Sequence, residues 1–210
     1  MKKINVVKRQ HITALGQEPF EQVHASTLAL CGDGSIAAAW FGGTHEKNPD
    51  VRIWFSKTTS DGRWSRPVAL SENNMIANWN PVLLAQGNRL TLFYKEGENI
   101  PIWRTYFRVS EDNGETWSET KLLVEDDTFG RGPVKNKPIV LSNGNILAGA
   151  SREDELGRWE IKVLFIYFLL YHFCLIMLEL AICQGSRASQ AAQVIKNPPA
   201  NAGSLGWEYP

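Results

Sequence analysis

The sequence predicts an all-β fold made of β-propeller blades, followed by one apolar α-helix. One hairpin pattern occurs three times, anchored on Ile36, Leu90 and Ile146, with spacings of 54 and 56 residues. A second marker, a Gly turn followed by Trp, recurs from Trp64 to Trp117 with a spacing of 53 residues. The composition then changes abruptly near Lys162. The first two observations predict the repeat, and the third limits how far it extends.

Each hairpin is an apolar strand, a turn rich in Gly, Asn and Asp, and a second apolar strand, which is the usual β-hairpin pattern. The three hairpins lie in residues 27–40, 82–94 and 139–148. A period near 50 residues, with about four strands in each unit, is typical of a β-propeller.

A turn of the form S-x-D-x-G-x-T-W spans Ser110–Trp117, and Thr59–Trp64 is a degraded copy of it. In such a turn the Asp accepts hydrogen bonds from backbone N–H groups, the Gly adopts a positive φ, and the Trp packs beneath. We expect these turns to be structural, at the edge of each blade.

Lys and Arg number 22, and Asp and Glu also number 22. This balance argues against a basic nucleic-acid surface and against an acidic disordered chain. Only four charged residues lie after Lys162, at Glu179, Arg187, Lys196 and Glu208. The composition therefore predicts three parts: a partial propeller over 1–162, an apolar helix over 163–183 and a disordered tail over 184–210.

The segment 163–183 is 21 residues long and contains a single acid, Glu179. A helix of about 20 residues spans about 30 Å, the thickness of a bilayer core, so this segment is a candidate transmembrane helix that would bring the chain into contact with a membrane. A buried core segment is the alternative. The N-terminus lacks an apolar stretch typical of a secretory signal, so the expected location is cytoplasmic or membrane-associated.

Several motifs occur in the order found in one known family. They are Ser110–Trp117, Trp40–Glu46, Asn48–Val51, Trp79–Val82, Phe93–Lys95 and Gly132–Pro138. On these motifs the chain resembles the sialidase-like (neuraminidase, BNR/Asp-box repeat) superfamily, in which the S-x-D-x-G-x-T-W turn is called an Asp box. The resemblance implies a six-bladed propeller with a sugar site on the central axis, of which this chain would supply about two and a half blades. The tail, in residues 190–203, resembles translated retroposon sequence.

The resemblance also implies a set of site residues. The acid/base carboxyl of the family follows the first hairpin, where Asp50 is the nearest candidate and Glu46 the next. His24 stands where sialidases have an Arg that grips the substrate carboxylate, and His lacks the bidentate fork of that Arg. The remaining candidates for substrate binding are polar or basic: Asn80, Lys95, Arg131, Lys135, Lys137 and Arg152.

The resemblance thus predicts a glycoside hydrolase of the exo-sialidase type that acts on acidic glycans and is incomplete in this chain. Two alternatives remain open: a non-catalytic carbohydrate-binding propeller and a non-functional truncated product. A glycan is the expected partner, with no nucleic acid. No phosphate loop, cofactor motif or metal cluster is visible in the sequence, so neither a cofactor nor a metal is expected.

Overall fold

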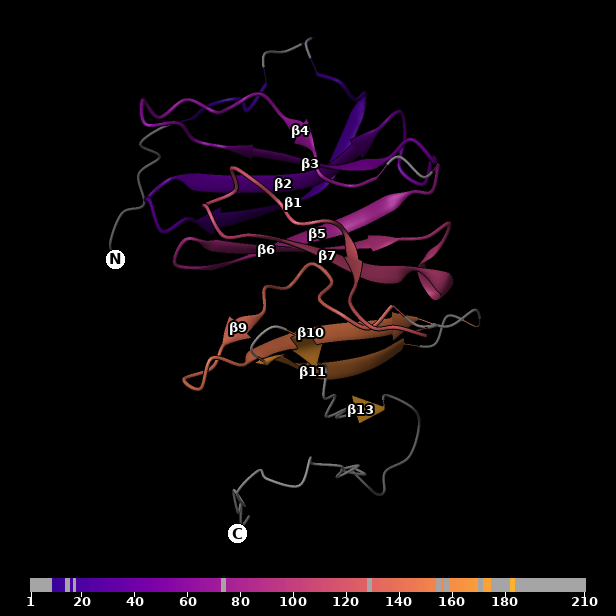
Figure 1. Cartoon of the computed structure of the whole chain (residues 1–210). Helices are drawn as coiled ribbons and strands as arrows, with labels where there is room; N and C mark the ends of the chain where they lie inside the picture. The colour runs from indigo at the N-terminus through magenta and orange to yellow at the C-terminus, as the bar shows by residue number, and fades with distance from the viewer. Residues whose placement is uncertain are drawn as a thin grey trace, which may run out of the picture.

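The computed structural model describes residues 9–13, 16, 18–72, 75–127, 130–153, 156, 159–169, 172–174 and 182–183. Within these residues the chain forms three antiparallel β-sheets, which lie one above another in Figure 1. In the first two sheets, the strands follow one another in chain order from one edge of the sheet to the other. The all-β architecture with propeller-like blades is therefore confirmed.

Sheet 1 contains β1 (Gln22–Leu30), β2 (Ile36–Gly43), β3 (Arg52–Lys57) and β4 (Val68–Ala69). Sheet 2 repeats this arrangement with β5 (Asn78–Gln86), β6 (Arg89–Glu96), β7 (Arg104–Ser110) and β8 (Lys121–Leu122). A short 3-10 turn, η1 (Ile100–Ile102), lies between β6 and β7. The first two predicted hairpins are thus the β1–β2 and β5–β6 pairs.

Sheet 3 contains the third predicted hairpin, formed by β9 (Ile139–Val140) and β10 (Ile146–Glu153). Next to β10 lies β11 (Trp159–Leu169), which pairs in turn with β12 (His172–Cys174) and β13 (Ile182–Cys183). The pairing of β10 with β11 runs from Ile146 opposite Ile166 to Glu153 opposite Trp159.

The prediction of an apolar helix over 163–183 is wrong for the described part of that segment. Residues 163–169 continue β11, and residues 172–174 and 182–183 form β12 and β13. The segment is rich in β-branched and aromatic residues, which favour strands, and its backbone pairs with β10 where the repeat needs a third strand. No described helix has the length and apolar character needed to span a membrane. The predicted tail, 184–210, lies outside the described residues.

Two apolar layers hold the sheets together. Between sheets 1 and 2, Phe41 and Ile53 pack against Leu83 and Leu92. Between sheets 2 and 3, Val82, Leu84 and Phe93 pack against Ile146 and Leu164. Sheet 2 is covered on both faces, which explains why β6 is buried from Leu90 to Glu96 rather than alternating.

The strand order gives each sheet two ends. We call one the Asp-box end, because the β1–β2 and β5–β6 turns lie there with residues 110–117. We call the other the loop end, where β1 and β5 begin and β2 and β6 finish. Just inside the loop end, β1 bulges between His24 and Thr27, and β5 bulges between Trp79 and Val82. The two bulges are 55 residues apart, so the repeat includes this local irregularity of the strand.

Candidate functional site

The Asp box is a self-contained turn. Asp112 accepts hydrogen bonds from the Thr116 backbone N at 2.9 Å, from Thr116 Oγ1 at 2.5 Å and from Ser110 Oγ at 2.7 Å. These donors, those of Thr116 first, lower the pKa of Asp112 to about 2. Gly114 has a φ of 89° and lies against Phe55, and a Cβ there would come within 2.7 Å of that ring. The turn therefore serves structure, as predicted.

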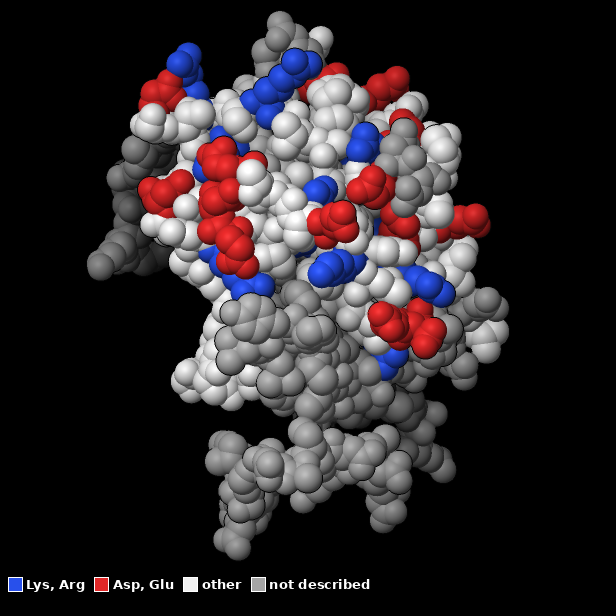
Figure 2. All heavy atoms as spheres, viewed as in Figure 1, with Lys and Arg blue, Asp and Glu red and all other residues white. Residues whose placement is uncertain are grey.

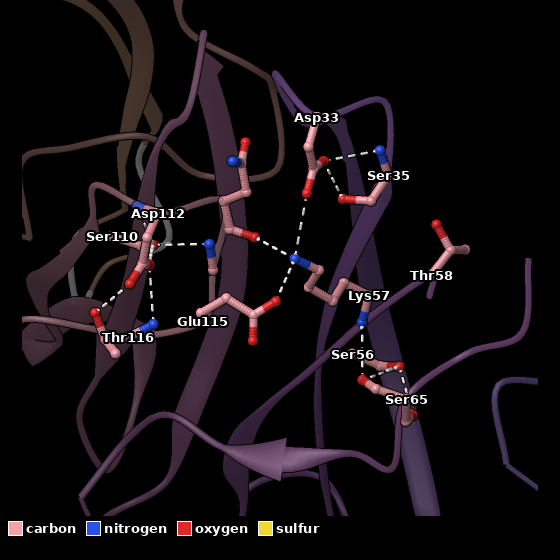
Figure 3. Close-up of polar contacts among 12 residues, drawn as sticks. Asp33, Ser35, Ser56, Lys57, Thr58, Ser65, Ser110, Asp112, Glu115 and Thr116 are labelled. Atoms are coloured by element: carbon pink, nitrogen blue, oxygen red, sulfur yellow. Dashed lines mark hydrogen bonds and ion pairs between the residues drawn. The ribbon is translucent and has the colours of Figure 1, made fainter. Parts of the chain in front are cut away.

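Lys57 joins sheets 1 and 2 at the Asp-box end, as Figure 3 shows. Its Nζ lies 2.8 Å from Glu115 Oε1 and 3.5 Å from Asp33 Oδ2, and it donates to the Asn113 carbonyl at 3.1 Å. Burial of Lys57 disfavours its charge, but the carboxylates of Glu115 and Asp33 outweigh that and raise its pKa. A cleft of about 960 Å³ lies beside this ion-pair network and is lined also by Trp117.

At the opposite, loop end, residues 44–51 connect β2 to β3 and carry both predicted catalytic carboxyls. Asp50 Oδ2 accepts hydrogen bonds from the Thr44 backbone N at 2.7 Å and from Thr44 Oγ1 at 2.6 Å. The Thr44 hydroxyl and then its N–H lower the pKa of Asp50, so this exposed carboxyl is ionised near neutral pH. Glu46 is also exposed, and its side chain has no hydrogen bond or ion pair with the described residues.

Two of the predicted substrate-binding residues, His24 and Asn80, lie at the matching bulges of β1 and β5. His24 is exposed on β1, and its ring lies 5.6 Å from that of Phe41. Asn80 is half-buried on β5 and adopts a φ of 42°, as Ala25 beside His24 adopts a φ of 51°. A cavity of about 280 Å³ adjoins His24 and is lined mainly by apolar side chains, including Phe20 and Trp40.

Lys95, predicted as a substrate contact, is fully buried at the loop end of β6. Its Nζ donates to Thr105 Oγ1 at 2.5 Å, to the Gly130 carbonyl, and to the Gly132 carbonyl at 3.4 Å. It also lies 5.6 Å from the centre of the Trp103 ring. Burial lowers the pKa of Lys95 to about 7, against the opposing effect of the Asp127 charge. In this arrangement Lys95 contacts protein groups rather than solvent.

The basic cluster lies on the segment 127–138, which we call the link because it joins sheet 2 to β9. Arg131 is half-buried and pairs with Asp127, with Nε 3.0 Å from Oδ1. Lys135 is exposed and has a φ of 63°. Lys137 is exposed too, and its ammonium donates to the Leu28 carbonyl of β1, so the link reaches from sheet 2 back to sheet 1.

Arg152 lies near the end of β10, opposite Glu160 of β11, and its side chain lies outside the described part of the chain. On the face that Figure 2 shows, acidic and basic side chains are interspersed rather than gathered into a field of one sign.

The loop end thus brings together residues that are far apart in the sequence. The Val51 carbonyl, next to Asp50, accepts hydrogen bonds from Asn78 N at 3.1 Å and Asn78 Nδ2 at 3.0 Å, two residues before Asn80. The Gly97 N–H at the end of β6 bonds the Ala77 carbonyl at 3.0 Å. The two bonds of Asn78 join the β2–β3 loop of sheet 1 to the first residues of sheet 2, and the Gly97 bond closes the same end of sheet 2.

Four residues that shape this end were not predicted from the sequence. Thr44 holds Asp50, while Trp103, Thr105 and Asp127 surround Lys95 and the link. The signal for the latter group was present in the two glycines that flank Arg131, because a pair of glycines so placed is typical of a close approach between backbone and a neighbouring element. No group of three or more His, Cys, Asp or Glu side chains that could hold a metal occurs within the described ranges.

Comparison with solved structures places this fold among the sialidases. A Hadza microbial sialidase, Hz136, superposes with a TM-score of 0.61 at 15% identity, over 78% of this chain and 40% of that chain. Trypanosoma rangeli sialidase in complex with sialic acid gives a TM-score of 0.54 at 17% identity, over 69% of this chain and 28% of that chain. A protein of unknown function from Dyadobacter fermentans gives 0.53 at 14% identity, over 68% and 50%.

At these identities the likeness establishes the fold alone, and this chain spans half or less of the length of each of those proteins. No curated protein sequence matches it significantly. The BNR repeat-like domain family, however, matches residues 34–166, which is more than half of the chain. The match begins in the first hairpin and ends in β11, so it includes the Asp box, the β2–β3 loop and the link. The chain belongs to the BNR repeat-like domain family.

Proposed function

We propose that the loop end forms part of the acidic-glycan site of a sialidase-like glycoside hydrolase. One observation carries the proposal: the β2–β3 loop, with two carboxyls, and the start of sheet 2 are hydrogen-bonded together at one end of the sheets, where the basic link also passes. At the Asp-box end, Lys57 is already bound to two carboxylates, and Arg66 is the other basic residue that lines the cleft. Carboxyls beside cations are what hydrolysis of an anionic glycoside needs.

In this proposal Glu46 and Asp50 have different roles. A general acid must carry a proton before it can donate one to the leaving oxygen. Asp50 is held ionised by two donors from Thr44, which suits it to fixing the shape of the loop. Glu46 lies on the same loop, exposed and without a partner among the described residues, so its carboxyl is free to approach a glycosidic oxygen.

The anionic group of the glycan would meet the link. Lys135 is exposed on the link, and His24 is exposed near the loop end of β1. Lys137 is exposed too, but it donates to the Leu28 carbonyl, nearer the Asp-box end of β1. Lys ammonium groups bind a carboxylate as point charges, without the bidentate geometry of Arg. The proposal therefore takes an acidic sugar as the substrate class, with sialic acid and a uronic acid as the two members to test.

A non-catalytic glycan-binding domain is the second candidate. Two observations favour it: Thr44 keeps Asp50, one of the two acid candidates, ionised, and His24 stands in place of a carboxylate-gripping Arg of sialidases. A binding domain needs the cations and polar groups of the loop end but no proton donor.

The discriminating experiment combines turnover and binding on the whole chain. Turnover of a fluorogenic sialoside would be measured beside calorimetric binding of 3′-sialyllactose, glucuronic acid and neutral lactose. Turnover that is lost in Glu46→Gln supports the hydrolase. Binding of an acidic sugar without turnover supports the binding domain. Equal affinity for lactose and 3′-sialyllactose, with no turnover, contradicts both.

A further inference from the structure

We propose that Lys95 is a positioning residue that holds the link against sheet 2 and so fixes where the cations of the link stand. The ammonium comes from the end of β6 and meets three acceptors, two of which are carbonyls of the link, those of Gly130 and Gly132. The third acceptor, Thr105 Oγ1 on β7, itself donates to the Gly130 carbonyl at 3.1 Å. One buried cation therefore ties together β6, β7 and the link.

The packing of the link agrees with this role. Gly130 has a φ of 61°, and a Cβ there would lie 2.4 Å from Trp103 Cδ1. Gly132 has a φ of 143°, and a Cβ there would lie 2.6 Å from Thr105 Cγ2. Both glycines thus let the backbone lie directly on the two residues that flank the ammonium, close enough for their carbonyls to reach it. Any other residue would lift the link off sheet 2.

The choice of a lysine at this point has a physical cost. A fully buried ammonium is desolvated, and a methionine of similar shape would avoid that penalty. The charged group that acts on it is Asp127 of the link, which favours the ammonium and is itself paired with Arg131, whereas Glu96, next in β6, points to the opposite face of the strand. What the lysine supplies and a methionine would not is three N–H donors directed at the link.

The consequence concerns the residues between and beyond the two glycines. Arg131 lies between them, and its backbone N donates to Asp127 Oδ2 at 2.5 Å. Lys135 and Lys137 follow within five residues of Gly132. If the carbonyls of Gly130 and Gly132 lose the Lys95 donor, the backbone that carries these three cations is no longer held against sheet 2. That effect on ligand binding rests on the proposed function, whereas the effect on the link does not.

Hydrogen exchange of the full chain at pH 6 tests the effect on the link. Lys95→Met removes the donors at similar volume, and Thr105→Val removes the hydroxyl that bridges Lys95 and Gly130. We expect amides of residues 130–137 to exchange at least tenfold faster in both variants, while β6 and β7 keep their rates. Lys57→Met, which removes a lysine bound to sheet 2 at the Asp-box end, is the matched control and should leave the link unchanged.

Calorimetric binding of 3′-sialyllactose to the same proteins tests the second part. We expect at least a tenfold loss of affinity in Lys95→Met and Thr105→Val, and none in Lys57→Met. Unchanged exchange of the link in Lys95→Met overturns the inference, even where affinity falls. Faster exchange throughout sheet 2 also overturns it, because Lys95 would then serve general stability. If the wild-type chain binds no 3′-sialyllactose while the link still loosens in Lys95→Met, the proposed function fails and the positioning role stands.

Discussion

Lys57 Nζ of sheet 1 lies 2.8 Å from Glu115 Oε1, which belongs to the Asp box of sheet 2. The same ammonium donates to the Asn113 carbonyl of that turn at 3.1 Å. An Asp box therefore contributes to the contact between neighbouring sheets, beyond closing its own turn. The Asn113 carbonyl and the Glu115 carboxylate of this turn both bind the Lys57 ammonium of sheet 1.

Loss of this contact should weaken the packing of sheets 1 and 2. We expect Lys57→Met to lower the free energy of unfolding by about 1 kcal/mol, because it removes a hydrogen bond and two ion pairs around one cation. Glu115→Gln should lower it by about 0.5 kcal/mol or less, because Glu115 is largely exposed. Urea unfolding at low salt measures both. A larger loss in Glu115→Gln than in Lys57→Met would contradict the assignment of Lys57 as the centre of the network.

Asp112 should stabilise the fold in a pH-dependent way. Its folded pKa, about 2, lies below the ordinary value of 3.8 for an aspartate, so its contribution is present above about pH 4 and is lost as pH falls towards 2. Asp112→Asn should therefore melt at a lower temperature than wild type at pH 7, and the difference should shrink at pH 2.5. Glu119→Gln, at an exposed residue two positions after the box, is the control. A melting difference for Asp112→Asn that stays constant down to pH 2.5 would show that its carboxylate charge is not what matters.

Lys95 should act on stability in the opposite range of pH. Its folded pKa is about 7, whereas the unfolded lysine titrates near 10.5, so between these values the unfolded chain binds the extra proton. The free energy of unfolding should therefore rise with pH across this window, by up to about 1.4 kcal/mol per pH unit. Denaturation of wild type and Lys95→Met at pH 7 and 9.5 measures the difference. An equal pH response in both proteins would mean that burial does not lower the pKa of Lys95.

The two carboxyls of the β2–β3 loop should respond differently to substitution. If turnover of a fluorogenic sialoside is found, Glu46→Gln should lower kcat by at least 100-fold, the usual scale for a lost general acid. Asp50→Asn keeps one acceptor for Thr44 and should act mainly on KM through the shape of the loop. The reverse pattern, with kcat lost in Asp50→Asn and retained in Glu46→Gln, would return the acid role to Asp50.

Local pattern in the sequence was enough to predict the strands of the repeat. The hairpins anchored on Ile36, Leu90 and Ile146 all form, because each joins two apolar stretches through a turn of Gly, Asn or Asp. The helix over 163–183 failed because length and hydropathy do not separate a buried strand from a helix. The expected third strand of sheet 3 would have been the better guide, since residues 163–169 fall where the repeat places one.

The sequence predicted only part of the arrangement of the site residues. The resemblance implied that Asp50, Lys95 and Lys137 belong to one site. Asp50 and Lys95 both lie at the loop end, whereas Lys137 bonds Leu28 nearer the Asp-box end of β1. The sequence could not predict that Lys95 faces inward, because a lysine after a strand is usually solvated. Burial of Lys95 depends on Trp103 and Gly130, which lie 8 and 35 residues away and contact it only in the folded chain.

The central claim is that an acidic glycan binds at the loop end. Hydrogen exchange of the full chain with and without 3′-sialyllactose tests it most directly, because it reports every segment at once. We predict slower exchange in residues 41–51 and 130–138, an effect that salt weakens, with no change in residues 110–117. Slower exchange confined to the Asp-box end, or no change anywhere at a saturating concentration of the sugar, would contradict the claim.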